Sequence, residues 1–368
     1  MEKRQIGSGP SASILGLGCM RMPQTVNDQG ETSLKMDEAV ELIRHAIDAG
    51  ITYIDTAYPY HNGDSEVAVG LALRDGYRER VTLATKCPVW KMETTEDFSA
   101  VLTEQLEKLQ TESIDMYLFH ALSKSRWQTV LDLRLLEEAR KEQAAGRILN
   151  IGFSFHDDAA AFQMILNGFD WDFCQLQMNY INVDFQSTLQ GLYAAHAKGL
   201  GIIIMEPLLG GKLADPPAVV KELIPGDPID FALRWLWDKP EVAVVLSGMN
   251  DIHQVDENIR RAENFTKLAP EEHPVYAAVK QRYDTMALVP CTKCHYCMPC
   301  PFGVNIPGVF EAYNITASQN KAAGRLRYEP LDKQADACVG CQACEQVCPQ
   351  FIPIATHMPK ISAYFQES

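Results

Sequence analysis

The sequence predicts an α/β chain: a closed (β/α)8 TIM barrel followed by a small, mainly α-helical C-terminal domain. From residue 15 to about residue 263, short β-branched runs alternate with amphipathic stretches, which is typical of βα units around a parallel sheet. Eight of the eleven cysteines lie after residue 290, in two compact runs that indicate a separate metal-binding domain. We therefore expect a barrel domain over residues 1–286 and a cysteine-rich domain over residues 287–368.

Eight segments have the length and composition of barrel strands. They are Ile14–Cys19, Ile51–Asp55, Val81–Lys86, Ile114–Phe119, Ile148–Phe153, Phe173–Met178, Gly201–Met205 and Val242–Ser247. The intervening segments repeat apolar residues at helical spacing. They are Met36–Ala49, Asp64–Arg74, Thr95–Leu109, Trp127–Ala145, Asp157–Asn167, Gln186–Lys198, Asp227–Trp237 and Asp251–Glu263. Eight such units are the number in a (β/α)8 barrel, and no G-x-G-x-x-G follows the early strands to favour a Rossmann sheet.

Beyond the barrel, Glu271–Leu288 and Val309–Lys321 are predicted helices, and the cysteine runs lie on either side of the second. The later run matches the C-x2-C-x2-C-x3-C-P ligand pattern of bacterial iron–sulfur proteins, and the earlier run is one residue shorter before its last cysteine. The runs consist of Cys291, Cys294, Cys297 and Cys300, and of Cys338, Cys341, Cys344 and Cys348. They predict two [4Fe-4S] clusters.

In that pattern the fourth cysteine of each run serves the other cluster, so we expect Cys348 to join the first three cysteines and Cys300 to join the second three. Disulfides are the first alternative, but they are typical of small secreted domains, and no apolar signal segment precedes Gly7. Zinc is the second alternative, because C-x2-C pairs also bind zinc. Four evenly spaced cysteines followed by proline favour iron–sulfur clusters.

Composition excludes some partners. At 368 residues with 46% hydrophobic content, the chain can form one large domain and a small one. A net charge of −15 argues against nucleic acid and against an anionic membrane surface. No apolar run reaches the eighteen or so residues of a membrane helix. Cysteines kept as thiolate ligands predict a reducing cytoplasm.

Four polar residues lie where three consecutive strands end, at the face where such barrels hold their active sites. Asp55 ends one strand, Tyr60 follows on its loop, and Lys86 and His120 end the next two. Taken singly, each has a structural explanation, such as a rim aspartate or a hydrogen-bonded core histidine. Their shared location favours an active site.

These four side chains have the chemistry to reduce a carbonyl group. The carbonyl oxygen needs a proton as hydride arrives, and Tyr60 can donate it as a general acid or accept it during alcohol oxidation. We expect the Lys86 ammonium to lower the pKa of Tyr60 and Asp55 to pair with Lys86. His120 would hydrogen-bond the substrate oxygen.

At these positions the sequence resembles the aldo-keto reductase family, over roughly residues 3 to 265. The cysteine region resembles the subgroup with a C-terminal two-cluster, α-helical ferredoxin-like domain. The resemblance implies NADP(H) or NAD(H) bound across the barrel mouth. The implied cofactor contacts are Gly18, Cys19 and Met20 near the nicotinamide ribose, Asp55 beside it, Ser154 and Gln175 at the carboxamide, Met205 on the nicotinamide, Pro207, Leu208 and Gly210 at the pyrophosphate, and Gly248, Met249, Gln254, Glu257 and Asn258 at the adenosine.

Some positions depart from the family pattern. Phe155 stands where many members have an asparagine, and Gly248 and Gln254 stand where NADPH-preferring members often have a lysine and an arginine. The choice between NADH and NADPH is therefore open. The sequence predicts a cytoplasmic oxidoreductase for an aldehyde, ketone or alcohol, with a ferredoxin or flavoprotein as candidate electron partner. The alternative is a redox-sensing or electron-distributing module without small-carbonyl turnover, but such a module needs no proton donor.

Overall fold

The computed structural model describes residues 1–27, 32–286, 288–318 and 320–367. The chain divides into two compact units, Met1–Pro207 with Leu233–Lys267, and Leu208–Ala232 with Leu268–Ser368. Each unit has its own cluster of buried hydrophobic side chains. Residue 287, at the predicted domain boundary, lies outside the described residues, so the boundary after residue 286 stays a prediction.

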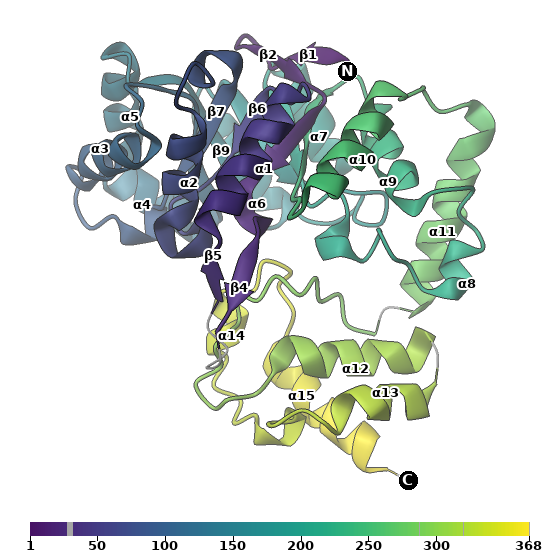
Figure 1. Ribbon diagram of the computed structural model, residues 1–368. Coiled ribbons are helices and arrows are strands. Elements are labelled where there is room, and N and C mark those ends of the chain that lie inside the picture. The colour runs from purple at the N-terminus through teal and green to yellow at the C-terminus, as the bar shows by residue number, and fades with distance from the viewer. Residues whose placement is uncertain (28–31, 287, 319, 368) are drawn as a thin grey trace. The chain divides into compact units, whose positions relative to one another are not determined.

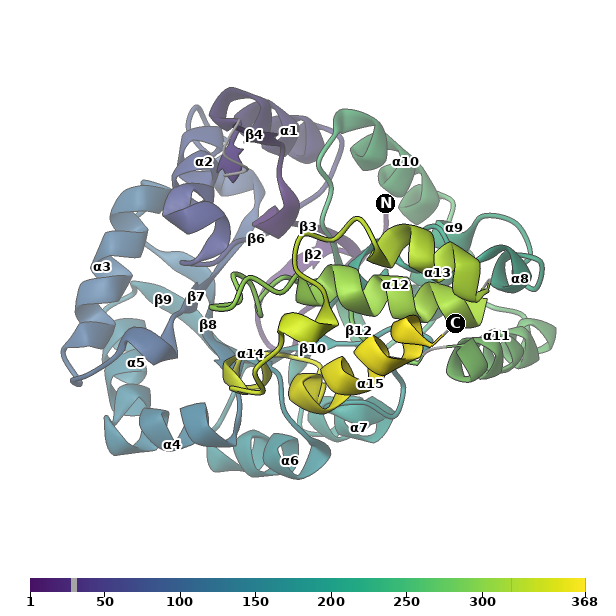
Figure 2. The same ribbon diagram turned by 90° about the horizontal axis from the view of Figure 1, so that it is seen from below.

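The first unit contains a closed barrel of eight strands, and every described strand pair in it is parallel (Figure 2). The strands are β3 (Leu15–Gly18), β6 (Tyr53–Asp55), β7 (Thr82–Cys87), β8 (Ile114–Leu122), β9 (Ile148–Phe155), β10 (Phe173–Gln177), β11 (Gly201–Met205) and β12 (Val242–Ser247). All eight predicted strands are confirmed. A parallel barrel buries both faces of its strands, and every residue of β7 and β12 is buried. Strand β12 is accordingly an almost continuous apolar run, whereas β7 also contains two threonines and Lys86.

Helices surround this barrel (Figures 1 and 2). They are α1 (Met36–Asp48), α2 (Asp64–Ala72), α3 (Asp97–Leu109), α4 (Lys124–Asp132), α5 (Leu135–Ala144), α6 (Ala159–Gly168), α7 (Thr188–Ala197), α9 (Pro228–Trp237) and α10 (Ile252–Glu263). Helix α1 is a typical case, because its buried residues Leu42, Ile43 and Ala46 recur at helical spacing. The prediction of one helix over Trp127–Ala145 is wrong. The chain forms α4 and α5 instead, because Arg134 adopts a left-handed backbone with φ of 54°.

Two antiparallel strand pairs were not predicted. Strand β1 (Lys3–Gln5) pairs with β2 (Ser11–Ser13), and β4 (Gln24–Val26) pairs with β5 (Thr32–Leu34).

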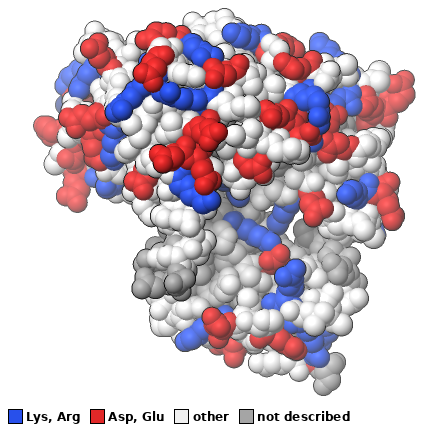
Figure 3. Space-filling view, viewed as in Figure 1, with Lys and Arg blue, Asp and Glu red and all other residues white. Residues whose placement is uncertain are grey.

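Acidic and basic side chains are interspersed over the face shown in Figure 3. Within the described residues, no helix has both the length and the apolar character needed to cross a membrane.

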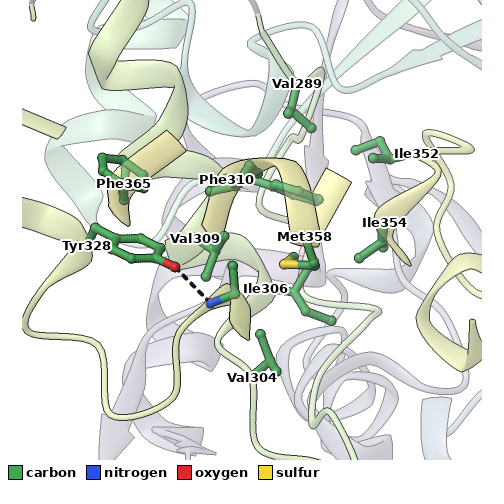
Figure 4. Close-up of a cluster of buried hydrophobic side chains, with 13 residues drawn as sticks. Val289, Val304, Ile306, Val309, Phe310, Tyr328, Ile352, Ile354, Met358 and Phe365 are labelled. Atoms are coloured by element: carbon green, nitrogen blue, oxygen red, sulfur yellow. Dashed lines mark hydrogen bonds between the residues drawn. The ribbon is translucent and has the colours of Figure 1, made fainter. Parts of the chain in front are cut away.

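The second unit is mainly helical. Its helices are α8 (Ala218–Lys221), α11 (His273–Met286), α12 (Ile306–Ser318), α13 (Lys321–Tyr328), α14 (Ala343–Gln346) and α15 (Ile354–Gln366). Helix α11 lies within the predicted segment Glu271–Leu288, whereas α12 begins at Ile306, before the predicted segment Val309–Lys321. Residues 287 and 319 of those segments are outside the described residues. Figure 4 shows the core of this unit, in which Phe310 and Met358 are completely buried. The Tyr328 hydroxyl accepts a hydrogen bond from the Ala335 amide at 3.1 Å.

Candidate functional site

A buried ion pair lies where β6 and β7 end. The Lys86 ammonium donates to Asp55 Oδ2 at 2.7 Å and to the Thr56 carbonyl at 2.7 Å. Asp55 is 2% exposed and Lys86 is 1% exposed, so neither charge is solvated by bulk water. Burial raises the pKa of Asp55, and the neighbouring Lys86 charge opposes that rise. The pairing of Asp55 with Lys86 expected from the sequence is present.

Tyr60 and His120 lie beside this pair. Tyr60 is half-buried at the start of a 3-10 turn, η2 (Tyr60–Gly63), and the Lys86 Nζ atom lies 5.0 Å from its ring centroid. The rings of Tyr60 and His120 meet edge to face, with centroids 6.0 Å apart. The structure therefore brings together all four residues predicted at the strand ends.

The protonation of this group differs from one sequence-based expectation. The pKa of Tyr60 is raised well above 10, first by burial and then by the Asp55 charge, so the expected net lowering of that pKa is wrong. Burial lowers the pKa of His120 well below 6.5, and the Lys86 charge lowers it further. At neutral pH, Tyr60 keeps its proton and His120 is an uncharged imidazole. This is the arrangement that a proton donor and a neutral hydrogen-bonding partner require.

The position of His120 depends on strained backbone. The next residue, Ala121, has φ of 52°, and the register of β8 against β9 shifts between Phe119 and Leu122. Two side chains hold Ala121: the Ser154 hydroxyl accepts from its amide at 2.7 Å, and Arg126 donates to its carbonyl at 2.7 Å. Ser154 thus supports the His120 segment. A left-handed residue other than glycine beside a site residue is the kind of strain that functional sites accumulate.

Trp90 was not singled out from the sequence. Its ring centroid lies 5.1 Å from that of His120, and the side chain is 45% exposed. The Arg126 guanidinium lies over the Trp90 ring, 5.1 Å from its centroid. A large exposed aromatic residue three positions beyond Cys87, at the end of β7, is the signal that could have found it.

The predicted carboxamide contacts converge on the same strand ends. Gln175 lowers the pKa of the neighbouring Asp55 carboxyl group, and its Nε2 atom lies 3.7 Å from the Met205 sulfur. The Gln175 Oε1 atom is buried and has no partner among the described residues. A buried amide oxygen without a donor fits a ligand amide that donates to it, as a nicotinamide carboxamide does.

The predicted adenosine contacts lie on the loop after β12 and on α10. Asn258 Nδ2 donates to the Ser247 hydroxyl at 3.2 Å, and Arg261 bonds both Asn258, at 3.1 Å, and Glu257, at 3.3 Å. Gln254 lies in the first turn of α10, where its Oε1 atom accepts from the Asn250 amide at 3.1 Å. Asn258, Arg261 and Glu257 thus form one polar network with Ser247, and Gln254 bonds separately to the loop before α10.

Arg21 lies against the predicted adenosine loop, a position that the sequence did not reveal. A side chain at Gly248 would meet the Arg21 Cδ atom at 3.2 Å, so the glycine leaves room for the arginine stem. Gly18, Cys19 and Met20 precede Arg21 on the loop after β3. Of the other predicted contacts, Pro207 ends a segment of the first unit, whereas Leu208 and Gly210 belong to the second.

The two cysteine runs have left-handed residues at matching positions. In the first, Lys293 and His295 have φ of 57° and 63°. In the second, the corresponding residues Gly340 and Gln342 have φ of 72° and 60°. Left-handed residues on both sides of a cysteine curl each loop, which is how a short C-x2-C-x2-C segment can aim several sulfurs at one cluster.

Four cysteines of the second unit line one pocket. They are Cys291, Cys294, Cys297 and Cys348. The pocket has about 310 Å³ of space between atoms, part of it open to solvent, and its apolar wall includes Phe310 and Ile354. The membership of Cys348 in this set agrees with the crossed ligand assignment. An apolar pocket with four thiols fits the donor set of an iron–sulfur cluster.

Further interactions surround this pocket. The Lys293 amide donates to the Cys291 sulfur at 3.4 Å, and the Lys212 ammonium donates to the Cys291 carbonyl. Among the described residues, no group of three or more His, Cys, Asp or Glu side chains is arranged to hold a single metal ion.

The second cysteine set is more open. Cys341 is exposed, whereas Cys338 and Cys344 are half-buried. The pKa of Cys344 is raised to about 11, mainly by burial and in part by the charges of Glu345, Cys338 and Cys341. These three cysteines are therefore electrostatic neighbours.

Comparison with known proteins gives matches over both parts of the chain. The sequence pattern described as "Aldo/keto reductase family" matches residues 14–218, and "4Fe-4S dicluster domain" matches residues 290–352. "Probable aldo-keto reductase 1" of Glycine max is 25% identical over 299 residues, which cover 68% of this chain and 81% of that protein. "Aldo-keto reductase YhdN" of Bacillus subtilis (strain 168) is 37% identical over 157 residues, which cover 40% of this chain and 44% of the relative.

Solved structures share the fold. The holo form of aldo-keto reductase AKR11C1 from Bacillus halodurans has a TM-score of 0.65 and 23% identity, covering 76% of this chain and 96% of that chain. An aldo-keto reductase from Klebsiella pneumoniae in complex with NADPH has a TM-score of 0.61 and 23% identity, covering 77% of this chain and 96% of that chain.

Proposed function

The chain belongs to the aldo/keto reductase family and carries a C-terminal 4Fe-4S dicluster domain, and from that premise we propose that it transfers hydride between a nicotinamide cofactor and an aldehyde, ketone or alcohol. One observation carries the proposal: a protonated tyrosine and a neutral histidine lie beside a buried Asp55–Lys86 ion pair. A redox sensor has no need for this set of groups.

Each residue of this set has a separate proposed role. The nicotinamide supplies or accepts hydride when bound. Tyr60 donates its proton to the carbonyl oxygen during reduction and takes it back during alcohol oxidation. His120, held uncharged, hydrogen-bonds the same oxygen and fixes its direction. The ion pair between Asp55 and Lys86 keeps a positive charge 5.0 Å from the Tyr60 ring, where it stabilises negative charge on the phenol oxygen in the transition state.

We assign the cofactor contacts along the strand ends as the sequence predicts. The unpartnered Gln175 Oε1 atom supports a carboxamide contact, and the loop after β3 supports contacts to the phosphates and ribose. Arg21, whose stem fits against Gly248, adds a cation at the adenosine end. Either NADP(H) or NAD(H) meets these requirements, and the Klebsiella pneumoniae relative was solved with NADPH.

The cysteine domain is assigned two [4Fe-4S] clusters with crossed ligands. One uses Cys348 with the first three cysteines, and the shared pocket supports this set. The other uses Cys300 with Cys338, Cys341 and Cys344. Thiolate ligands of this kind require a reducing compartment such as the cytoplasm, and one-electron exchange with a ferredoxin or flavoprotein follows from the chemistry of such clusters.

The test of this function replaces Tyr60 in the full-length protein. Tyr60→Phe should lower carbonyl reduction by about two to four orders of magnitude, because only the proton donor is lost. Its dissociation constant for the nicotinamide cofactor should stay near the wild-type value. Tyr58→Phe is the matched control, because Tyr58 is on the same loop but its hydroxyl bonds Glu104 at 3.1 Å. Wild-type turnover by the Tyr60 variant would contradict the proposed chemistry.

A further inference from the structure

Thr292 lies between two predicted cluster ligands, and its hydroxyl has no partner in the described structure. The residue is 2% exposed, and it lines the same pocket as Cys291, Cys294, Cys297 and Cys348. The Oγ1 atom is buried without a hydrogen bond. A buried hydroxyl that forms no hydrogen bond destabilises the fold, so such a group in a folded protein needs an explanation.

The surroundings of Thr292 limit what that partner can be. The rest of the pocket wall includes Ile306, Phe310 and Ile352, which are 3% exposed or less and offer no side-chain acceptor. Two polar side chains, His295 and Gln350, also line the pocket, but the Thr292 hydroxyl bonds neither of them. The four cysteine sulfurs are the other side-chain acceptors of this pocket. One such bond already exists, since the Lys293 amide donates to the Cys291 sulfur at 3.4 Å.

The other cysteine loop has no such donor. Thr292 follows the first cysteine of its run, and the residue at the same place in the second run is Val339. The two loops have left-handed residues at the same two places, on either side of the second cysteine, so these positions correspond in local backbone as well as in sequence. Val339 is 62% exposed and carries no polar side-chain atom. At this matched position, one cluster site has a hydroxyl group and the other has none.

We propose that the Thr292 hydroxyl donates a hydrogen bond to a sulfur of the cluster held by Cys291, Cys294, Cys297 and Cys348, and thereby raises the reduction potential of that cluster alone. The inference rests on the proposed assignment of a cluster to these cysteines. Reduction adds one electron to the cluster, and the added negative charge strengthens a hydrogen bond to sulfur. The bond thus stabilises the reduced form more than the oxidised form. The apolar wall increases the effect, because hydrogen bonds are stronger in a medium of low dielectric constant.

The experiment is a redox titration of the full-length protein, purified without oxygen and followed by electron paramagnetic resonance with dithionite as reductant. Thr292→Val, which replaces the hydroxyl with a methyl group of similar size, should lower one of the two midpoint potentials and leave the other unchanged. Thr292→Ser keeps the hydroxyl and should titrate like the wild type. Val339→Ala is the matched control in the other loop and should change neither potential.

Iron and sulfide content decide how each result is interpreted. Unchanged potentials in a fully loaded Thr292→Val protein would overturn the inference, as would an equal drop in Thr292→Ser. If Thr292→Val loses iron, Thr292→Ala removes the same hydroxyl without steric demand and should show the same drop in one midpoint potential. Loss of iron from both variants would show that Thr292 has a structural role and would contradict the proposal. Failure of the wild type to bind iron would instead overturn the cluster assignment itself. None of these readouts depends on carbonyl turnover.

Discussion

Lys86→Met should destabilise the barrel in a way that depends on pH. The substitution leaves Asp55 as a carboxylate that is 2% exposed and has lost its only described cationic partner. Removing one member of a buried ion pair typically costs about 3–5 kcal/mol. Asp55 can limit that cost by taking up a proton. At pH 7, protonating a carboxyl group with an ordinary pKa of about 3.9 costs about 4 kcal/mol, so the loss should be about 3–4 kcal/mol.

The sign of the pH effect follows from the same carboxyl group. Burial already raises the folded-state pKa of Asp55, and losing Lys86 raises it further. The folded variant therefore binds more protons than the unfolded chain between about pH 4 and pH 7, and its stability increases as the pH falls. Near pH 5 the cost of protonation is only about 1.5 kcal/mol, so the deficit of the variant should shrink to about that value.

Urea unfolding followed by far-ultraviolet circular dichroism at pH 5 and pH 7 measures this difference. Lys108→Met is the control, because Lys108 forms a partly exposed ion pair with Glu104 and should lose less than about 1 kcal/mol. Adding Asp55→Asn to Lys86→Met should recover part of the stability at pH 7, since no buried charge remains. A loss of unfolding free energy below about 1 kcal/mol, or a loss that is the same at both pH values, would refute the interpretation that Lys86 neutralises a buried Asp55 charge.

Two further results are expected. Burial and the Arg126 charge lower the pKa of His156 from 6.5 to about 4. The folded protein should therefore lose stability as the pH falls from about 6.5 to about 4, because the unfolded chain takes up the proton first. His156→Gln should flatten this part of the curve of unfolding free energy against pH, and an unchanged curve would count against the burial of a neutral imidazole. Cys348→Ser should alter the spectrum of the cluster held by the first cysteine run, whereas Cys300→Ser should alter the other; the reverse result would exclude crossed ligation.

The sequence was sufficient to predict the barrel because most of its strands are buried on both faces and are therefore rich in apolar residues, as in β11 and β12. The break between α4 and α5 was not predictable, because Arg134 is an ordinary helix former whose left-handed backbone is set by its surroundings. The short β1–β2 and β4–β5 pairs were missed for a similar reason. Their strands have three residues each, too few to show a period of two.

The candidate site was predictable in its residue types and not in its electrostatics. The order of Asp55, Tyr60, Lys86 and His120 along the chain placed them at three strand ends, and the structure brings them together. The raised pKa of Tyr60 depends mainly on burial, which one sequence does not report. Gln175 is similar, because its unpartnered oxygen is visible only once the neighbouring strands are in place.

The central claim is that Tyr60 supplies the proton that accompanies hydride transfer. The most direct measurement is a single-turnover, stopped-flow assay of the full-length protein with an aldehyde and reduced nicotinamide carrying deuterium at the transferred position. The wild type should show a primary isotope effect on loss of the reduced nicotinamide signal. Tyr60→Phe should bind the cofactor normally but react about two to four orders of magnitude more slowly. A wild-type protein that binds the cofactor without consuming it, or a variant as fast as the wild type, would contradict the account.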